Sequence, residues 1–436
     1  MKIKTIYFVL ALLTLVNLPF NPINGQSKDN LFVFGDALPD APELSKRGDF
    51  DVGVRTIDLV NKNQIDILNS KEGLDPRYDR PLKVEVWYPS EKFDKENLIT
   101  YKDVLGLAGD PKRPLIPFTF KGRAKRSANP EKGEGPFPLI IVSHGYVGSR
   151  YLMTYLTENL ASKGYVVVAI DHTESTFQDA APFQSTLLNR PKDILFVIDE
   201  ISKMGMDEKN DLLSGLVDAD NTAIIGYSMG GYGALNAAGA AYSDFAINLF
   251  AGMTGGSKAL TSRGMNSSEF TNSYDPRIKA VVAFAPWGMA RGVWNLETLK
   301  GLKVPTFFIV GSQDDISGYE KGVKAIYNGA INAERYLLTY KNARHNVAPN
   351  PPPIEAMKPD LHIDEYYRYA EPVWDERKIN NINQHFVTAF LGKLLKKQDY
   401  DTYLDLPENS NTETWTGFIP RSSPGLELLH ATPQQK

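Results

Sequence analysis

The chain has 436 residues, of which 42% are hydrophobic and 23% are charged, and its net charge is −4 at neutral pH. These values fit a globular protein large enough for one α/β domain with insertions, and the acidic balance argues against a nucleic-acid-binding protein. The sequence contains no cysteine. That absence excludes disulfides, a cysteine nucleophile, thiolate metal sites and a lipid-modified cysteine behind a signal peptide.

The N-terminus has the pattern of a signal peptide. Lys2 and Lys4 precede an apolar run over residues 6–18, which is too short to span a bilayer as a stable helix. We predict a signal peptide over residues 1–25 with cleavage near Gly25, and an uncleaved anchor is the alternative. Because no second run of spanning length follows, the protein is expected to be secreted or periplasmic and to have no membrane span.

A polar leader is expected over residues 26–50 and an α/β domain over residues 51–400. Residues 52–60 and 82–88 alternate apolar and polar positions, as the antiparallel start of a sheet does. Residues 91–136 are polar and rich in Gly, Pro and Lys, which indicates an insertion or long surface loop, and residues 242–273 form a second insertion. A polar C-terminal tail is predicted over residues 401–436, either wrapped on the surface or loose.

Between these segments, short apolar runs alternate with stretches of helical spacing. The strands are expected at residues 139–143, 165–170, 222–226, 279–284, 306–310 and 335–340. The helices are expected at residues 152–163, 193–203, 230–241, 319–327 and 382–395. This alternation predicts a mostly parallel sheet covered by helices on both faces.

The strongest chemical signal is the run Gly-Tyr-Ser-Met-Gly at residues 226–230, placed between a predicted buried strand and a glycine-rich helix. A serine on a sharp strand-to-helix turn has its hydroxyl exposed above the sheet, and the flanking glycines let the helix pass close to the strand. We therefore predict that Ser228 is the nucleophile of a serine hydrolase with the α/β-hydrolase fold.

A serine nucleophile needs a base and an acid that orients the base, and in this fold they follow the serine in the order acid, then histidine. His345 comes a short loop after the strand at residues 335–340, which is where the base belongs. The acid is expected in the loop after the strand at residues 306–310, which contains both Asp314 and Asp315. Asp314 is the prediction, and Asp315 remains the alternative.

Two backbone N–H groups are needed to hold the oxyanion of the intermediate. One is assigned to Met229, which follows the nucleophile, and the other to Tyr146, in the loop after the strand at residues 139–143. His144 precedes the nucleophile and is expected to support this loop. Asp171 and His172 form a weak metal-site pattern, and a structural loop is favoured.

Trp287 follows the strand at residues 279–284 and is expected beside the nucleophile. The prediction makes it, with Tyr146, a wall of the substrate site, and a core tryptophan is the alternative. No convincing cluster of metal ligands exists, so no metal or other cofactor is expected.

Several of these segments resemble known families. Residues 143–150 (SHGYVGSR), 160–165 (LASKGY) and 169–172 (AIDH) resemble platelet-activating-factor acetylhydrolases and bacterial dienelactone-hydrolase-like proteins. The Gly-x-Ser-Met-Gly-Gly elbow at residues 226–231 and the Pro286-Trp287 pair are similar to those of bacterial cutinases. Residues 342–346, 370–375 and 380–390 resemble the dienelactone-hydrolase-like group in particular. The resemblance covers residues 52–395 and implies a serine esterase that needs no cofactor.

The departures from these families narrow the substrate. True dienelactone hydrolases use a cysteine, which this chain lacks, and eukaryotic acetylhydrolases carry the acid after the strand matching residues 279–284, where Ala285 and Pro286 stand here. The acid therefore comes from the later loop, as in the cutinases. Compact cutinases lack the long segments 91–135 and 242–273, which are expected to narrow the site against polymers.

The sequence thus predicts a secreted esterase for short acyl groups, with a small-molecule, lipid or polysaccharide ester as substrate. A phospholipid acetylhydrolase, a polysaccharide deacetylase and a cutinase-type polyester hydrolase are the alternatives, and a catalytically dead binding protein is the alternative of another class. The acyl and alcohol groups and the oligomeric state are left open.

Overall fold

One large sheet organises the computed structural model of this chain, which describes residues 32–107, 110 and 112–434. The contacts divide the chain into Met1–Phe32 and Val33–Lys436, and the description that follows concerns the second unit. The expected signal peptide over residues 1–25 lies outside the described residues.

The large sheet has the strand order β12-β11-β10-β9-β8-β6-β7-β2-β1-β5, and β3 and β4 form a separate two-stranded sheet. The strands have these bounds: β1 Asp51–Ile65, β2 Arg77–Ser90, β3 Thr100–Leu105, β4 Ile116–Lys121, β5 Lys125–Arg126, β6 Phe137–Ser143, β7 Val166–Asp171, β8 Val217–Tyr227, β9 Ile278–Phe284, β10 Thr306–Gly311, β11 Arg335–Tyr340 and β12 Leu426–Ala431.

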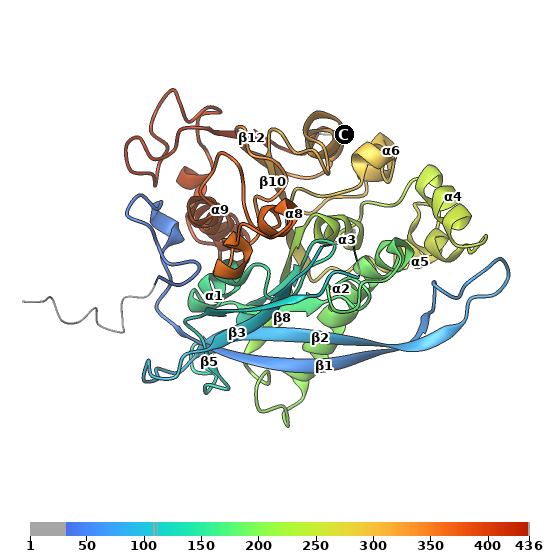
Figure 1. Cartoon of the computed structure of the whole chain (residues 1–436), viewed down its shortest axis with the longest axis horizontal. Helices are drawn as coiled ribbons and strands as arrows, with labels where there is room; N and C mark the ends of the chain where they lie inside the picture. Colours follow the sequence, from blue (N-terminus) through green and yellow to red (C-terminus); the bar gives the residue numbers. More distant parts are fainter. Residues whose placement is uncertain (1–31, 108–109, 111, 435–436) are drawn as a thin grey trace, which may run out of the picture. The chain divides into compact units, whose positions relative to one another are not determined.

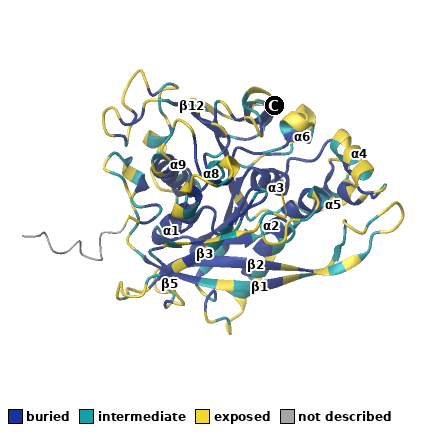
Figure 2. Ribbon diagram, in the orientation of Figure 1, coloured by how far each residue is buried: buried dark blue, intermediate teal, exposed yellow. Residues whose placement is uncertain are grey.

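The middle of the large sheet is parallel, from β7 through β6, β8, β9 and β10 to β11. Every residue of β6, β10 and β11 is buried, as Figure 2 shows for the inner strands. Continuous apolar runs fold this way because helices cover both faces of a parallel sheet. At the other end β1 and β2 pair antiparallel, as their alternating pattern predicted. This arrangement confirms the predicted α/β-hydrolase fold.

Two helix pairs flank the sheet. Helix α1 (Thr154–Ser162) packs against α9 (Glu376–Lys396), and α2 (Phe183–Met206) packs against α3 (Met229–Ala237). In Figure 1 the first pair lies to the left of β8 and the second to its right. The remaining α-helices are α4 Asp244–Met253, α5 Ser268–Asn272, α6 Leu296–Leu299, α7 Lys324–Gly329 and α8 Ile363–Tyr367. Shorter turns lie at Glu43–Ser45, Ala259–Arg263, Met289–Arg291, Tyr319–Val323, Ile354–Met357 and Asp401–Tyr403.

Helix α2 begins ten residues before the predicted start at residue 193. It contains Pro191, whose ring nitrogen has no hydrogen to donate to the carbonyl of Leu187 one turn earlier. The hydroxyl of Tyr232 in α3 donates to that carbonyl instead, at 2.8 Å. A side chain from another helix thus allows α2 to continue through a residue that usually ends a helix.

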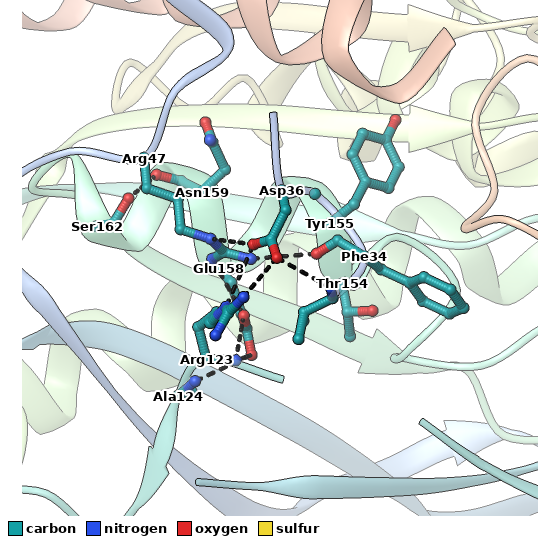
Figure 3. A network of polar contacts seen from close by, with 12 residues as sticks. Phe34, Asp36, Arg47, Arg123, Ala124, Thr154, Tyr155, Glu158, Asn159 and Ser162 are labelled. Carbon is teal, nitrogen blue, oxygen red and sulfur yellow. Dashed lines mark hydrogen bonds and ion pairs between the residues drawn. The ribbon is translucent and has the colours of Figure 1, made fainter. Parts of the chain in front are cut away.

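The described part of the predicted leader packs against the domain. In Figure 3 the buried Glu158 of α1 receives hydrogen bonds from Arg47 of the leader, at 3.1 Å, and from the amide of Arg123, at 2.9 Å. Arg123 also binds Asp36 of the leader, at 2.5 Å. These contacts agree with a compact unit that includes residues 33–50, ahead of the expected domain start at residue 51.

The C-terminal segment also differs from its prediction. Residues 426–431, expected in a loose or wrapping tail, form β12, which pairs antiparallel with β11 from Leu426 opposite Tyr340 to Ala431 opposite Arg335. Trp415 and Phe418 are buried, and both rings pack against Phe386 of α9. The tail is part of the domain because it covers an edge of the sheet that would otherwise expose unpaired backbone groups.

Both predicted insertions are folded. The first, residues 91–136, contains β3, β4 and β5, and Arg113 joins it to α8 through a hydrogen bond to Glu365, at 2.7 Å. The second, residues 242–273, contains α4 and α5. In the part of the chain that is described, no helix is both long and apolar enough to cross a bilayer.

Candidate active site

Ser228 occupies the turn between β8 and α3 with φ 53° and ψ −112°. Such a backbone conformation is costly for a residue with a side chain and persists only where the surrounding structure enforces it. The Ser228 amide donates to the carbonyl of Phe284, at 2.8 Å, and the Ser228 carbonyl accepts from the amides of Tyr232 and Trp287, at 3.0 and 3.1 Å. Backbone bonds to β9 and α3 therefore hold the serine in place.

The two glycines of the elbow are required by close backbone contacts. A Cβ atom on Gly230 would lie 1.9 Å from the carbonyl oxygen of Ser143 in β6, and one on Gly226 would lie 2.3 Å from the carbonyl oxygen of Gly230. Helix α3 can start this close to the sheet only because neither residue has a side chain. The spacing of the motif thus reflects the packing that lifts Ser228 above the sheet.

His345 lies between Ser228 and Asp314. Its Nε2 atom is 3.0 Å from Ser228 Oγ, and its Nδ1 atom is 3.0 Å from both carboxylate oxygens of Asp314. Asp314 has no exposed side-chain surface and His345 only 9%. These distances and this order are those of a nucleophile, a base and an acid that orients the base.

The structure separates the two candidate acids. Asp315 points to Arg344, with Nε of Arg344 3.2 Å from Asp315 Oδ1, and both side chains are 45% exposed. Asp314 instead receives the amides of Ile316 and Ser317 on Oδ1, both at 2.9 Å. Burial works to raise the pKa of Asp314, but the His345 charge, the ring hydrogen bond and these amides outweigh it and hold that pKa below its ordinary value. Asp314 is thus stabilised as a carboxylate beside His345.

The remaining predicted site residues are Tyr146, Met229 and Trp287. Tyr146 lines the same cavity as Ser228, and its hydroxyl donates to the carbonyl of Ala181, at 3.1 Å. Met229 is the first residue of α3, a position whose N–H has no partner within the helix. Trp287 is not among the residues that line this cavity, and its ring packs on Phe183 of α2 with 5.3 Å between centroids. That Trp287 forms a wall of the substrate site stays a prediction.

A buried polar network supports the loop that carries Tyr146. Arg190 of α2 donates to the carbonyl of His144 and to Ser175 Oγ, the latter at 2.6 Å. His172 lies between Ser143 Oγ, at 2.8 Å, and Asp193 Oδ2, at 2.9 Å. Burial, aided by the charge of Arg190, lowers the pKa of His172 to about 3, so this ring is neutral at physiological pH.

This network agrees with the structural roles expected for His144 and His172. His144 contacts the carbonyl of Gly145, at 2.6 Å, and its own Nε2 accepts the amide of His172, at 3.2 Å. Asp171 is paired with Arg150. Among the residues the structure describes, no group of three or more possible ligands is arranged to hold a metal ion.

A cavity of about 330 Å³ opens over Ser228 and His345. This volume lies at the lower end of the range for small-molecule sites. Its walls come from the segment of the first insertion that follows β3, the Tyr146 loop, the segment after β7, the loops after β10 and β11, and the segment around α8. The lining residues are Gly106, Leu107, Tyr146, Phe177, Ser228, Asp315, Ile316, Arg344, His345, Asn346, Asp364, Tyr367, Arg368, Ala370, Glu371 and Pro372. The first insertion therefore borders the site as expected, whereas residues 242–273 contribute no wall to this cavity.

Glu371 is a residue of this cavity that the sequence interpretation did not identify. Its carboxylate accepts the amide of Arg344 on Oε2, at 2.5 Å, and the amide of Asn346 on Oε1, at 2.6 Å. These amides flank His345 on both sides, so one buried carboxylate holds the backbone of the histidine loop. The only sequence signal was its place in residues 370–375, which carried part of the family resemblance.

We expect Glu371→Gln to lower kcat/KM by about ten- to a hundredfold, because one flanking amide would then face an N–H₂ group. Burial raises the pKa of Glu371, and the charge of His345 opposes that rise, so the two charges stabilise each other. Removing the carboxylate disfavours the imidazolium, and the acidic limb of the pH profile of kcat/KM should move to lower pH. Asp364→Asn, which removes an exposed carboxylate of the same cavity, is the control. An equal loss at every pH, accompanied by a lower Tm, would indicate a purely structural role.

Several known proteins are similar to this chain. A family model described as PETase, PET hydrolase-like, matches residues 126–254. Cutinase est1 of Thermobifida alba is 25% identical over 212 residues, which cover 48% of this chain and 54% of the cutinase. Cutinase 2 of Thermobifida cellulosilytica is 23% identical over 214 residues, covering 49% of this chain and 62% of that protein. The chain thus spans a little more than half the length of these curated relatives.

A solved structure extends the similarity to the whole fold. The ferulic acid esterase from Streptomyces cinnamoneus superposes with a TM-score of 0.55 at 17% identity, over 89% of this chain and 99% of that one. Its agreement supports the architecture, and the match to the family model covers the segment that contains Ser228. The chain has the α/β-hydrolase fold and is similar in sequence to bacterial cutinases.

Proposed function

We propose that this protein is a serine carboxylic-ester hydrolase in which Ser228, His345 and Asp314 form the catalytic triad. The observation that carries the proposal is the continuous hydrogen-bond chain from Ser228 Oγ through the His345 ring to Asp314, built on a strained turn above the sheet. The names of the related proteins, cutinase and PET hydrolase, support hydrolysis of esters. Because Ser228, His345 and Asp314 are all present and hydrogen-bonded in series, a binding protein that has lost catalysis is disfavoured.

In the proposed mechanism, Ser228 Oγ attacks the ester carbonyl carbon while His345 Nε2 takes the hydroxyl proton. The backbone N–H groups of Tyr146 and Met229 hold the oxyanion, and Asp314 stabilises the imidazolium through Nδ1. The tetrahedral intermediate expels the alcohol, which receives the proton from His345. A water molecule, deprotonated by the same ring, then attacks the acyl-enzyme and releases the carboxylic acid and free Ser228.

The substrate that fits the proposal best is a small ester with a short acyl group. The cavity is compact, and its walls include the segment of the first insertion after β3 and the segment around α8. A polyester is the second candidate, because the matching family is described as PET hydrolase-like. The added walls over Ser228 favour the small ester.

A panel of para-nitrophenyl esters tests this proposal, together with an amorphous polyester film. We expect acetate and butyrate to be hydrolysed with at least tenfold higher kcat/KM than octanoate, because the longer chain has to displace the cavity walls. Faster hydrolysis of octanoate, or release of soluble products from the film at a comparable rate, would contradict the short-chain assignment. Ser228→Ala run in parallel distinguishes enzymatic from background hydrolysis.

We also propose that the protein is exported. The apolar run at residues 6–18 and the small residue Gly25 support removal of residues 1–25. Sequencing the N-terminus of the protein recovered from its producing cells tests this, and a chain that still begins at Met1 would contradict it.

A further inference from the structure

Arg368 places a positive charge in the wall of the proposed catalytic cavity. It directly follows α8 and lines the same cavity as Ser228 and His345. Its Nη1 atom donates to the carbonyl of Tyr146, at 3.3 Å, and its guanidinium lies 5.7 Å from the ring centroid of Phe177. Its Nε and Nη2 atoms are buried and have no hydrogen-bond partner among the described residues.

The carboxylates of this cavity are all engaged elsewhere. Asp315 pairs with Arg344, and Glu371 accepts two backbone amides of the histidine loop. Asp364 is 69% exposed and lies beside His362, at 3.6 Å. Within the described part of the chain, therefore, no carboxylate comes within 4.0 Å of Arg368, the limit for an ion pair.

A partly buried guanidinium without a counter-ion is energetically unfavourable. Its N–H groups lose water on burial, and a single long bond to a carbonyl does not replace what a carboxylate offers. The planar guanidinium matches the two oxygens of a carboxylate better than any other cationic side chain does. A substrate that brings its own carboxylate into the cavity would supply the missing partner.

On the basis of the proposed esterase function, we propose that Arg368 binds a carboxylate carried by the substrate, so that the preferred substrates are anionic esters. The shared chemistry is an ester bond and an ionised carboxyl group in one small molecule. That carboxylate lies either on the acyl side, as in a monoester of a dicarboxylic acid, or on the alcohol side, as in an acylated hydroxy acid.

Two matched substrate pairs test the proposal and distinguish the two sides. Monoethyl glutarate carries the charge on the acyl side, and ethyl pentanoate is its neutral partner of equal acyl length. Para-acetoxybenzoate carries it on the alcohol side, and para-tolyl acetate is its neutral partner. The measured quantity is the ratio of kcat/KM for the charged ester to that for its neutral partner, taken at neutral pH and low salt.

The wild-type protein should favour the charged member of one pair, and Arg368→Gln should lower that ratio by about ten- to a hundredfold, mainly through KM. Arg368→Lys keeps the charge without the planar fork and should retain part of the preference. Arg55→Gln is the control, because it removes a cation that pairs with Asp211 and does not line this cavity. Its ratio should stay close to that of the wild type.

A wild-type protein with no preference for either charged ester would overturn the proposal. An Arg368→Gln variant that slows charged and neutral esters equally would also overturn it, because Arg368 would then serve only to hold the Tyr146 carbonyl. Failure of the esterase function itself looks different, since neither neutral ester would be hydrolysed and Ser228 would not react with a fluorophosphonate. Thermal unfolding of each variant shows whether it is folded.

Discussion

Replacing Ser228 with alanine is expected to abolish ester hydrolysis and labelling by a fluorophosphonate probe, with a loss in kcat on the order of 10⁶-fold by analogy with other serine hydrolases. The physical reason is that His345 Nε2 would have no hydroxyl to deprotonate, although the oxyanion donors and the cavity would remain. Alanine keeps the Cβ atom and adopts the same backbone conformation at the same steric cost, so the turn should be retained.

Labelling by the fluorophosphonate, followed by mass spectrometry of the modified peptide, checks this result directly. Ser214→Ala, in the loop before β8 and outside the cavity, is the control and should be labelled as the wild type is. Equal Tm values for the two variants show that the loss is chemical. If Ser228→Ala were labelled at the wild-type level, the nucleophile would be another residue.

The second large effect is expected for Asp314→Asn, which should lower kcat on the order of 10⁴-fold by analogy with a serine protease triad. The asparagine Oδ1 atom can still accept the amides of Ile316 and Ser317, which bind Oδ1 of the aspartate, so the loop should keep its conformation. Its N–H₂ group would then face His345 Nδ1. The ring would carry its proton on Nε2, toward Ser228, and could not act as the base.

Asp315→Asn is the matched control for this experiment. It removes one exposed ion pair with Arg344, which contributes about 0.2–1 kcal/mol at most, and it leaves His345 and its partners untouched. We expect kcat within a few-fold of the wild type, measured at neutral pH with the preferred ester of the panel. A strongly reduced kcat for Asp315→Asn, together with a nearly wild-type kcat for Asp314→Asn, would reverse the assignment of the acid.

The two predictions concern Ser228 and Asp314, which are the two ends of a hydrogen-bond chain with His345 in its middle. The loop of His345 is held by Glu371 through two amides and by Tyr227, whose hydroxyl donates to Asn346 at 2.8 Å. Tyr227 is the residue before the proposed nucleophile. The packing of β8 thus positions both the serine and the loop that carries the proposed base.

The sequence by itself indicated the fold class, Ser228 and His345, and it narrowed the proposed acid to Asp314 or Asp315. Buried parallel strands read as continuous apolar runs, and the elbow requires small residues on both sides of Ser228. His345 and the Asp314-Asp315 pair could be predicted because each follows a strand by a short loop, and parallel strands bring their carboxyl ends to one edge of the sheet. These are local patterns, and local patterns are visible in one sequence.

Only the tertiary structure decided the contacts between segments that lie far apart in the chain. The pairing of β12 with β11, the anchoring of the leader on Glu158 and the bond from Arg113 to Glu365 have no local signature, since each joins residues separated by many others. The sequence left the direction of the Trp287 ring open, and in the structure this ring packs on Phe183 of α2.

The same reason explains why Glu371 and Arg368 escaped prediction. Nothing in the residues around Glu371 indicates that its carboxylate bridges two amides 25 and 27 positions earlier in the chain. Arg368 is one of many arginines, and it lacks a carboxylate partner among the described residues because of where Asp315, Asp364 and Glu371 lie in three dimensions. The role of a charged side chain depends on the groups around it, and only the folded protein brings those groups together.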